Sequence, residues 1–239
     1  MCAAALLAAA LLGMAGCASN ASTKRGEVQG ETYTMGEWLQ SDGNRVTQIA
    51  MHANEASLML LADKLYRRNP REWRKTAATR EAALAQVKAS VFESKPWPPL
   101  NGQRDVAALS LALAPDFEGD RVAAFIIACA DTIVTAHGGK HDFYYLDGVD
   151  PQHIYNAARD MEIALWLLAS RRDARGQPLL LANEIGAQER NLSFEREFGK
   201  IIARLDFLAV YASERYRRAG IDYVHGLLMA PVLAFLPVR

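Results

Sequence analysis

The 239-residue sequence has few cysteines and no excess of either charge. It contains three cysteines, and its 27 Lys and Arg residues balance its 27 Asp and Glu residues. Positions 1–16 carry no charged residue, so the chain without them is neutral as well. A neutral chain without a long acidic or basic tail argues against a nucleic acid or an anionic lipid held by overall charge. We therefore expect no nucleic-acid partner.

Motifs that mark catalytic and cofactor sites are also missing. The sequence has no G-x-S-x-G elbow for a nucleophilic serine and no H-E-x-x-H pair for a metal. It has no glycine-rich loop with the spacing of a phosphate or dinucleotide site either. The sequence thus predicts no catalytic residue and no cofactor, and it favours a protein that is not an enzyme.

The first residues have the order of a bacterial leader. An apolar run from Ala3 to Leu12 is too short to span a bilayer and has the length of a signal-peptide core. It is followed by Met14-Ala15-Gly16-Cys17. This order resembles the lipobox of bacterial lipoproteins. The resemblance implies cleavage before Cys17, with acylation of its sulfur and of its new amino group. The alternative is an ordinary secretory signal peptide.

The resemblance also implies an organisation and an address. Residues 1–16 would be removed, and 17–36, which are poor in large apolar residues, would form a flexible tether for an all-helical domain at 37–239. Ala18 follows the acylated cysteine, whereas an aspartate there would resemble the inner-membrane retention signal. We therefore expect a lipid anchor through Cys17 in the outer membrane, facing the periplasm.

The three cysteines reduce to one in the predicted mature chain. Cys2 leaves with the leader, Cys17 carries lipid, and Cys129 remains without a partner for an intramolecular disulfide. Cys129 lies within the apolar run 122–130, with no neighbouring His or Lys in the sequence. This context is typical of a small buried side chain and not of a reactive thiol.

Apolar periodicity predicts an all-α fold. Apolar residues recur every three or four positions over 44–68, 151–171 and 191–220, and a shorter helix is expected at 103–113. The segment 120–137 is apolar on nearly every side, which indicates a central buried helix. We therefore predict one irregular bundle of about six to eight helices.

One local signal predicts a helix boundary. Pro70 disfavours helical geometry at Asn69 and suits a first helical position. The Asn69 side chain is placed to cap the next helix, and Glu72 is placed to bond back to it. The pattern predicts that one helix ends here and that a second runs from about Pro70 to Val91.

The last residues are apolar but interrupted. The segment 223–238 contains Gly226, Pro231 and Pro237. We predict a short helix and an extended end that cover the bundle. The alternatives are insertion into a membrane interface and contact with a partner.

Basic and aromatic residues near the predicted helix boundary form a candidate partner surface. Such a surface suits a phosphate-bearing lipid or an acidic partner, whereas a simple solvated helix pair is the alternative. The tryptophan of the proline-rich connection 95–99 either joins this surface or only fastens the loop to the bundle. The candidate residues are Arg67, Arg68, Arg71, Trp73, Arg74 and Trp97.

Histidines and aspartates gather in one region of the sequence and are weak candidates for a metal site. Imidazole and carboxylate groups are ligands for zinc and iron. The spacing is poor, because two glycines at 138–139 should end the helix between the first two histidines. We therefore predict no metal site, and keep His137, His141, Asp142 and His153 as its only candidates.

The preferred functional hypothesis is a non-catalytic envelope lipoprotein. It would scaffold or assist another envelope component, with exposed helix faces as the contact surface. The first alternative is an envelope enzyme or metal-binding protein that uses the His137–His153 loop. The second is a carrier of an apolar small molecule in a cavity between helices.

Overall fold

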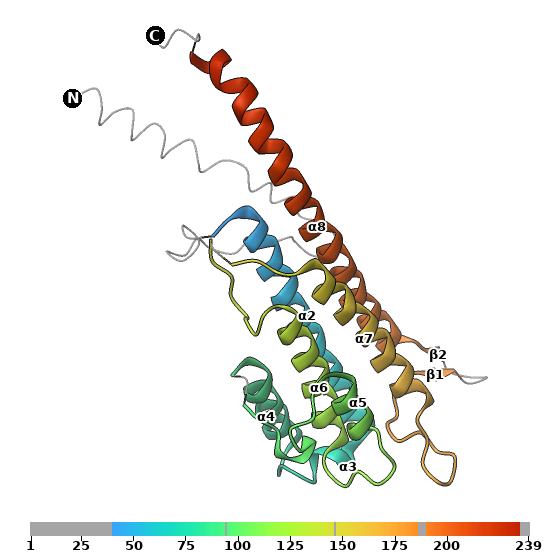
Figure 1. Cartoon of the computed structure of the whole chain (residues 1–239). Coiled ribbons are helices and arrows are strands. Elements are labelled where there is room, and N and C mark those ends of the chain that lie inside the picture. The colour runs from blue at the N-terminus through green and yellow to red at the C-terminus, as the bar shows by residue number, and fades with distance from the viewer. Residues whose placement is uncertain (1–39, 94, 146, 186–189, 235–239) are drawn as a thin grey trace, which may run out of the picture. The chain divides into compact units, whose positions relative to one another are not determined.

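The computed structural model describes residues 40–93, 95–145, 147–185 and 190–234. The predicted leader, Cys17 and the tether lie outside these residues. The described part is an irregular bundle of seven α-helices, together with one 3-10 turn and one pair of two-residue strands (Figure 1). The prediction of an all-α bundle is confirmed.

Most elements follow one another with short connections, and the longer ones are 137–150 and 171–183. The two strands pair antiparallel immediately before the last helix. In chain order, the elements are α2 (Asp42–Arg68), α3 (Pro70–Trp73), α4 (Arg80–Phe92), η2 (Pro98–Leu100), α5 (Asp105–Ala112), α6 (Arg121–Ala136), α7 (Pro151–Ser170), β1 (Glu184–Ile185), β2 (Arg190–Asn191) and α8 (Ser193–Ala234).

Helix α6 is the centre of the bundle, as its composition predicted. It packs against α2, α4, α5 and α7, and every residue from Val122 to Ala130 is buried. Its first turn is capped by Asp120, whose carboxylate accepts a hydrogen bond from the amide of Ala123 at 3.0 Å. Cys129 is fully buried within it, and burial raises the pKa of its thiol, so the predicted inert cysteine fits the structure.

Helices α2, α7 and α8 lie alongside one another around α6. The hydroxyl of Ser41 caps α2 by accepting from the amide of Asn44 at 3.2 Å. Asp150 caps α7 in the same way, with Pro151 in the first position, as the sequence predicted. Helix α8 packs against both α7 and α2. It does so through a buried apolar seam of Phe194, Phe198, Ile201, Leu205, Leu208 and Ala212.

The prediction of one helix from Pro70 to Val91 is wrong. Helix α3 ends at Trp73, and α4 begins only after Thr79. Thr79 has extended backbone angles, and its hydroxyl accepts a hydrogen bond from the amide of Ala82 at 3.1 Å. A threonine in this role competes with helix continuation, because its side chain satisfies an amide at the start of a new helix.

The predicted capping box at Asn69 is also wrong. The Asn69 amide group bonds to the carbonyls of Leu65 and Leu181, and it makes no cap contact with α3. The Glu72 carboxylate accepts from the backbone amide of Arg121 at 2.8 Å. Tertiary partners from α6 and from the 179–183 segment have therefore replaced the local hydrogen bonds that the sequence favoured.

The predicted cover at the end of the chain is absent from the described residues. Helix α8 continues to Ala234, well past its predicted end. Its last hydrogen bond to the bundle among the described residues is made by the Tyr216 hydroxyl, which donates to the carbonyl of Val149 at 3.3 Å. Beyond that point, the side chains at 217–225 and at Leu227 are all exposed. A glycine such as Gly226 costs a helix only about 1 kcal/mol, so it does not end α8.

The membrane-spanning potential of the helices follows from their length and composition. Among the described residues, no helix is both long enough and apolar enough to cross a bilayer.

Candidate functional site

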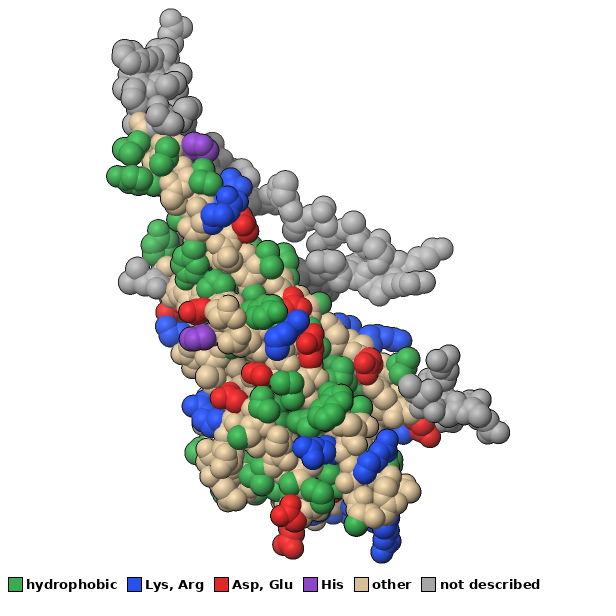
Figure 2. Space-filling model, turned by 45° about the vertical axis from the view of Figure 1, so that its right-hand side comes forward, with side chains coloured by type: hydrophobic (Ala, Val, Ile, Leu, Met, Phe, Trp, Pro, Cys, Tyr) green, Lys and Arg blue, Asp and Glu red, His purple; other side chains and the backbone are tan. Residues whose placement is uncertain are grey.

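Large apolar side chains are exposed together on the outer side of α7 and α8. Space-filling representation shows hydrophobic groups gathered over these two helices (Figure 2). Their exposed fractions lie between 38% and 65%, with Trp166 at 64%. We call this surface the α7–α8 patch, and it consists of Tyr155, Ile163, Trp166, Phe207 and Val210.

An ion pair aligns the two helices at this surface. The Arg159 guanidinium on α7 lies 2.8 Å from both carboxylate oxygens of Asp206 on α8. Residues four apart share one face of a helix, so Tyr155 lies beside Arg159 and Val210 lies beside Asp206. Because α7 and α8 run antiparallel (Figure 1), Tyr155 and Val210 are at the same level. The Arg159 guanidinium also stacks over the Tyr155 ring, 5.0 Å from its centroid.

The α7–α8 patch has the composition of a protein-binding surface. Tryptophan and tyrosine are enriched among the residues that dominate binding energy, and Trp166 and Tyr155 supply both types here. Phe207 extends the aromatic area by stacking on Tyr211, with ring centroids 6.0 Å apart. The sequence prediction missed this patch, because the apolar period of α8 marks only its buried seam. The sequence did contain one indication of the patch, since Phe207 and Val210 are apolar residues on the side of the helix opposite that seam.

The predicted basic surface is divided and partly neutralised. Arg67 pairs with Asp63 at 2.7 Å, one helical turn earlier on α2. Arg68 turns the other way and pairs with Glu184 of β1 at 2.7 Å. These exposed pairs contribute little to stability, but they reduce the positive charge that was expected to attract an acidic partner.

The two tryptophans of the predicted surface lie in different places. Trp73 and Arg67 line one pocket of about 400 Å³, and the Arg74 guanidinium lies 5.0 Å from the centroid of the Trp73 ring. Arg71 is exposed on α3. Trp97 lies before η2 and packs against the core, so it fastens its loop to the bundle, as the alternative interpretation predicted.

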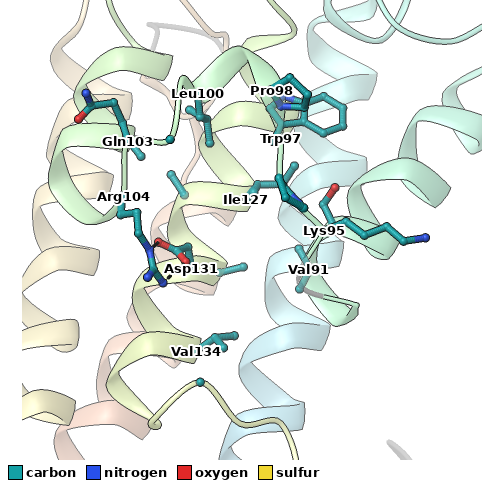
Figure 3. A pocket seen from close by; sticks show the side chains of 17 residues that line it. Val91, Lys95, Trp97, Pro98, Leu100, Gln103, Arg104, Ile127, Asp131 and Val134 are labelled. Carbon is teal, nitrogen blue, oxygen red and sulfur yellow. Dashed lines mark hydrogen bonds and ion pairs between the residues drawn. The ribbon is translucent and has the colours of Figure 1, made fainter.

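A separate cavity of about 480 Å³ lies where the loop 95–104 crosses α6 (Figure 3). Its polar edge is the pair of Arg104 and Asp131, whose Nη2 and Oδ1 atoms are 2.6 Å apart. Figure 3 shows the Arg104 side chain reaching down to Asp131 at one side of the opening. The rest of the lining is mainly apolar and includes Val91, Trp97, Leu100, Ile127 and Val134.

The geometry of this cavity suits a small ligand with a large apolar part. Cavities of a few hundred cubic ångströms with a few polar groups are typical of small-molecule sites. The indole N–H of Trp97 is buried and has no acceptor among the described residues. Arg104 is held in place, since its Nη2 also donates to the Thr135 hydroxyl at 2.7 Å, and the hydrogen bonds to Asp131 raise the pKa of Arg104.

His137 is a buried neutral histidine and not a ligand at an open site. Its Nδ1 lies 2.8 Å from the carbonyl of Ile133, so Nδ1 carries the proton and donates it. Burial lowers the pKa of His137 to about 4, and its ring packs 5.8 Å from that of Phe143. Its Nε2 is buried without a partner among the described residues.

The loop after α6 attaches to α2 through two histidine–carboxylate pairs. His141 Nδ1 lies 2.5 Å from the carboxylate of Glu55, which is buried on α2. Asp142 lies 3.5 Å from His52 Nε2, one turn before Glu55, and both side chains of this pair are partly exposed. The sequence gave no sign of these partners, because they lie some ninety positions earlier on α2.

The four candidate metal ligands are therefore used separately. His137 is in the core and His141 and Asp142 hold the loop, while His153 is exposed in the first turn of α7. Within the part of the chain that the structure describes, no group of three or more His, Cys, Asp or Glu residues is placed to hold a metal ion. In the His141 ring, Nδ1 contacts Glu55 and Nε2 is buried. Neither nitrogen is therefore accessible to a substrate in solution.

A buried polar network lies at the opposite end of α6. The Tyr66 hydroxyl donates to the Asp120 carboxylate at 2.8 Å, and the Thr76 hydroxyl donates to the same oxygen at 3.2 Å. Burial raises the pKa of Asp120 and also that of Tyr66. Both oxygens of the carboxylate accept hydrogen bonds that cap α6 or hold α2 and the 74–79 turn. This network therefore has a structural role.

Comparison with known proteins finds no relative of this chain. No family model matches it, and no curated protein or solved structure matches it either. The proposals below are therefore argued from the residues and contacts described above.

Proposed function

We propose that this protein is a lipid-anchored envelope protein without catalytic activity, and that it holds another envelope protein on the α7–α8 patch. The observation that carries the proposal is the exposure of Trp166, Phe207 and Val210, each at 60% or more, on two adjacent helices. The anchor is the acylated Cys17 that the lipobox resemblance implies. The outer membrane, facing the periplasm, remains the proposed address.

The physical argument is the cost of leaving this patch in water. Burial of apolar surface stabilises a complex by roughly 25 cal/mol per Å². Large contiguous apolar patches on a protein surface mark interaction sites, whereas single exposed apolar residues are normal. The Arg159–Asp206 pair lies among the apolar side chains of the patch and gives it a polar feature that a partner can match. A partner with an apolar helix or groove fits this chemistry.

Site-specific cross-linking in intact cells tests the proposal. A photoreactive phenylalanine analogue placed at position 166 of the native, acylated protein should give one reproducible protein adduct after illumination. The adduct should be reduced about tenfold or more by Val210→Glu, because a charge would be buried at the interface.

The control position comes from the other candidate surface. The same photoreactive residue at position 71 is exposed on α3, within the basic surface that the sequence suggested. No adduct is expected there. Adducts at position 71 with none at position 166 would show that the partner docks on the basic corner, and the proposed patch would be wrong.

Small-molecule binding is the second candidate function. It is favoured by the cavity between loop 95–104 and α6, with its apolar lining and the unpaired indole N–H of Trp97. Here the protein would carry a small apolar molecule that has one hydrogen-bond acceptor. No observation favours the enzyme alternative to the same extent, since the buried Nε2 atoms of His137 and His141 face no open site.

Native mass spectrometry of protein extracted in mild detergent tests this second function. A bound molecule should appear in the parent protein and be lost in Ala130→Leu, which narrows the cavity from α6. Ala164→Leu on α7 is a control of the same size at a buried position away from the cavity lining. Release of the ligand by both variants would point to general loosening of the fold and would count against the cavity as its site.

A further inference from the structure

The end of α8 is a further exposed apolar part of the described chain. Ile221, Tyr223, Val224 and Leu227 are exposed by 37% to 70%. They lie beyond Tyr216, which makes the last hydrogen bond of α8 to the bundle among the described residues. At 1.5 Å per residue, the helix from Tyr216 to Ala234 is about 27 Å long. This length of helix extends past the part of α8 that packs in the bundle.

The apolar side chains at this end point in opposite directions around the helix. Tyr223 and Leu227 continue the direction of the buried seam, because they follow Tyr216 at intervals of seven and four residues. Ile221 lies about 200° away from Tyr223 around the helix axis, and Val224 about 100°. A groove on a partner protein covers one stripe of a helix, so it would leave the other side exposed. A bilayer covers all apolar sides at once.

From Arg218 to Leu227, the Arg, Asp and His side chains are confined to one narrow stripe. Arg218, Asp222 and His225 follow one another at intervals of four and three residues, and all three are exposed. A wide apolar arc with one polar stripe is typical of helices that lie at a lipid interface. From position 226 to 238 the sequence contains no Asp, Glu, Lys, Arg or His. The polar stripe therefore ends where the helix would enter deeper into the lipid.

The residues at the start of this segment match the outer part of a bilayer. Arg215, Arg217 and Arg218 precede the apolar stretch. Arg217 pairs with Glu214 at 2.6 Å, so Arg215 and Arg218 supply the charges that suit lipid phosphate groups. Tyr216 and Tyr223 supply aromatic rings with a polar end, the type enriched at membrane–water interfaces. The order along α8 is thus basic, aromatic and then apolar, as expected for a helix that inserts with its C-terminal end.

We propose that α8 inserts into a phospholipid bilayer interface from about Ile221 onward, as an attachment in addition to any acyl chain. The insertion needs neither the α7–α8 patch nor acylation of Cys17. It is a peripheral attachment, since none of the described helices is suited to cross the membrane. The proposal accounts for the exposure of both sides of α8 beyond Tyr216 by naming the medium that covers them.

A depth-sensitive fluorophore on the full chain tests the insertion. One variant carries a nitrobenzoxadiazole label at Leu227→Cys, and a matched variant carries it at Val210→Cys, which is equally exposed but lies alongside the bundle. Both are reconstituted in vesicles of phosphatidylethanolamine and phosphatidylglycerol, and the parent protein sets the background labelling. Nitroxide-bearing acyl chains should quench the label at 227 at least about twofold more than the label at 210.

Two results would overturn the proposal. Equal quenching and equal emission maxima at the two positions would mean that the end of α8 stays in water. A blue-shifted label at 227 that acyl-chain nitroxides do not quench would mean that protein, including a second copy of this chain, covers it. Since both labelled positions are exposed, substitution should leave the fold intact, and an unchanged circular dichroism melting curve confirms this.

Discussion

Helix α6 and the end of α8 are both rich in apolar residues, yet one is buried on all sides and the other is exposed on all sides. In α6, the run from Val122 to Ala130 packs against helices on every side. In α8, the side chains at 217–225 are all exposed, although Ile221, Tyr223 and Val224 are apolar. Apolar composition therefore predicts that a segment is buried, but it does not predict which surface or medium covers it.

The comparison also distinguishes folding from binding. The apolar side chains of α6 contribute to the stability of the bundle, because folding removes them from water. Those at the end of α8 gain nothing from the folded bundle, so they are available for a partner or a bilayer. Substitutions in the two regions should therefore act on different measurements, and the predictions below test this in order of expected size.

The largest effect is expected in α6. Phe125→Ala removes a fully buried ring that packs against Phe198, with centroids 6.2 Å apart. It should lower the free energy of unfolding by about 3–5 kcal/mol, because it deletes buried apolar surface and leaves a cavity. Urea unfolding followed by circular dichroism measures the loss. A loss below about 1 kcal/mol would contradict the central position of α6.

A pH-dependent effect is expected at the C-terminal end of α6. The folded-state pKa of His137 is about 4, below its ordinary value of 6.5, because the ring is buried. Its contribution to stability is therefore present above pH 6.5 and is lost as the pH falls to 4. By linkage it amounts to about 3 kcal/mol.

The matched variant for this prediction is His137→Gln. A glutamine side chain keeps a donor for the carbonyl of Ile133 but does not titrate. Urea unfolding at pH 7 and pH 4.5 should show a smaller loss of stability in the variant than in the parent. Other groups near the ring, including His141 and Glu55, remain in both proteins and cancel in the difference. An equal loss in the two proteins would assign the pH dependence elsewhere.

An intermediate loss of stability is expected when a buried tyrosine hydroxyl is removed, and a smaller loss when an exposed one is removed. Tyr66→Phe leaves the buried carboxylate of Asp120 without one donor and should cost about 1–2 kcal/mol. Tyr216→Phe removes the hydroxyl that donates to Val149 at the exposed edge of α8, and it should cost less than about 0.5 kcal/mol. Thermal or urea unfolding of the two variants measures both losses in the free energy of unfolding, so that they can be compared. Equal costs would mean that the contact at Tyr216 holds α8 more strongly than its exposure suggests.

The smallest effect on stability is expected at the end of α8. Tyr223→Ala removes a large apolar side chain that is 70% exposed. The free energy of unfolding should change by less than about 0.5 kcal/mol, because the bundle loses no contact. A larger loss would show that this segment packs against a part of the chain outside the described residues. Phe125→Ala is the direct comparison, since both variants replace an aromatic residue by alanine in an apolar helical segment.

The elements that were predicted correctly depend on local rules. The caps Asp150 and Pro151 start α7, and periodic apolar residues define α2, α7 and the first part of α8. The buried position of α6 also followed from composition, because a helix that is apolar all round has no face for water. Local signals of this kind act within a few residues and can be recognised in one sequence.

The failures come from partners distant in sequence. Glu72 was expected to cap α3, but the amide of Arg121 takes its carboxylate. The weak metal-ligand candidates, for which the sequence predicted no site, lie apart because Glu55 and His52 on α2 each pair with one residue of the loop after α6. The α7–α8 patch was missed because Tyr155 and Val210 come together only in the folded protein, where the Arg159–Asp206 ion pair aligns their helices. No spacing along one segment contains this information.

The sequence by itself determined the helical class, the central apolar helix and the main caps, because these depend on residue type and on period. The leader, its cleavage and the lipid at Cys17 are also sequence predictions, and they concern residues outside those described. Only the tertiary structure decided that Phe207, Val210 and the apolar residues at the end of α8 stay exposed. That choice depends on neighbours supplied by other helices, and α8 runs past the last of them at Tyr216.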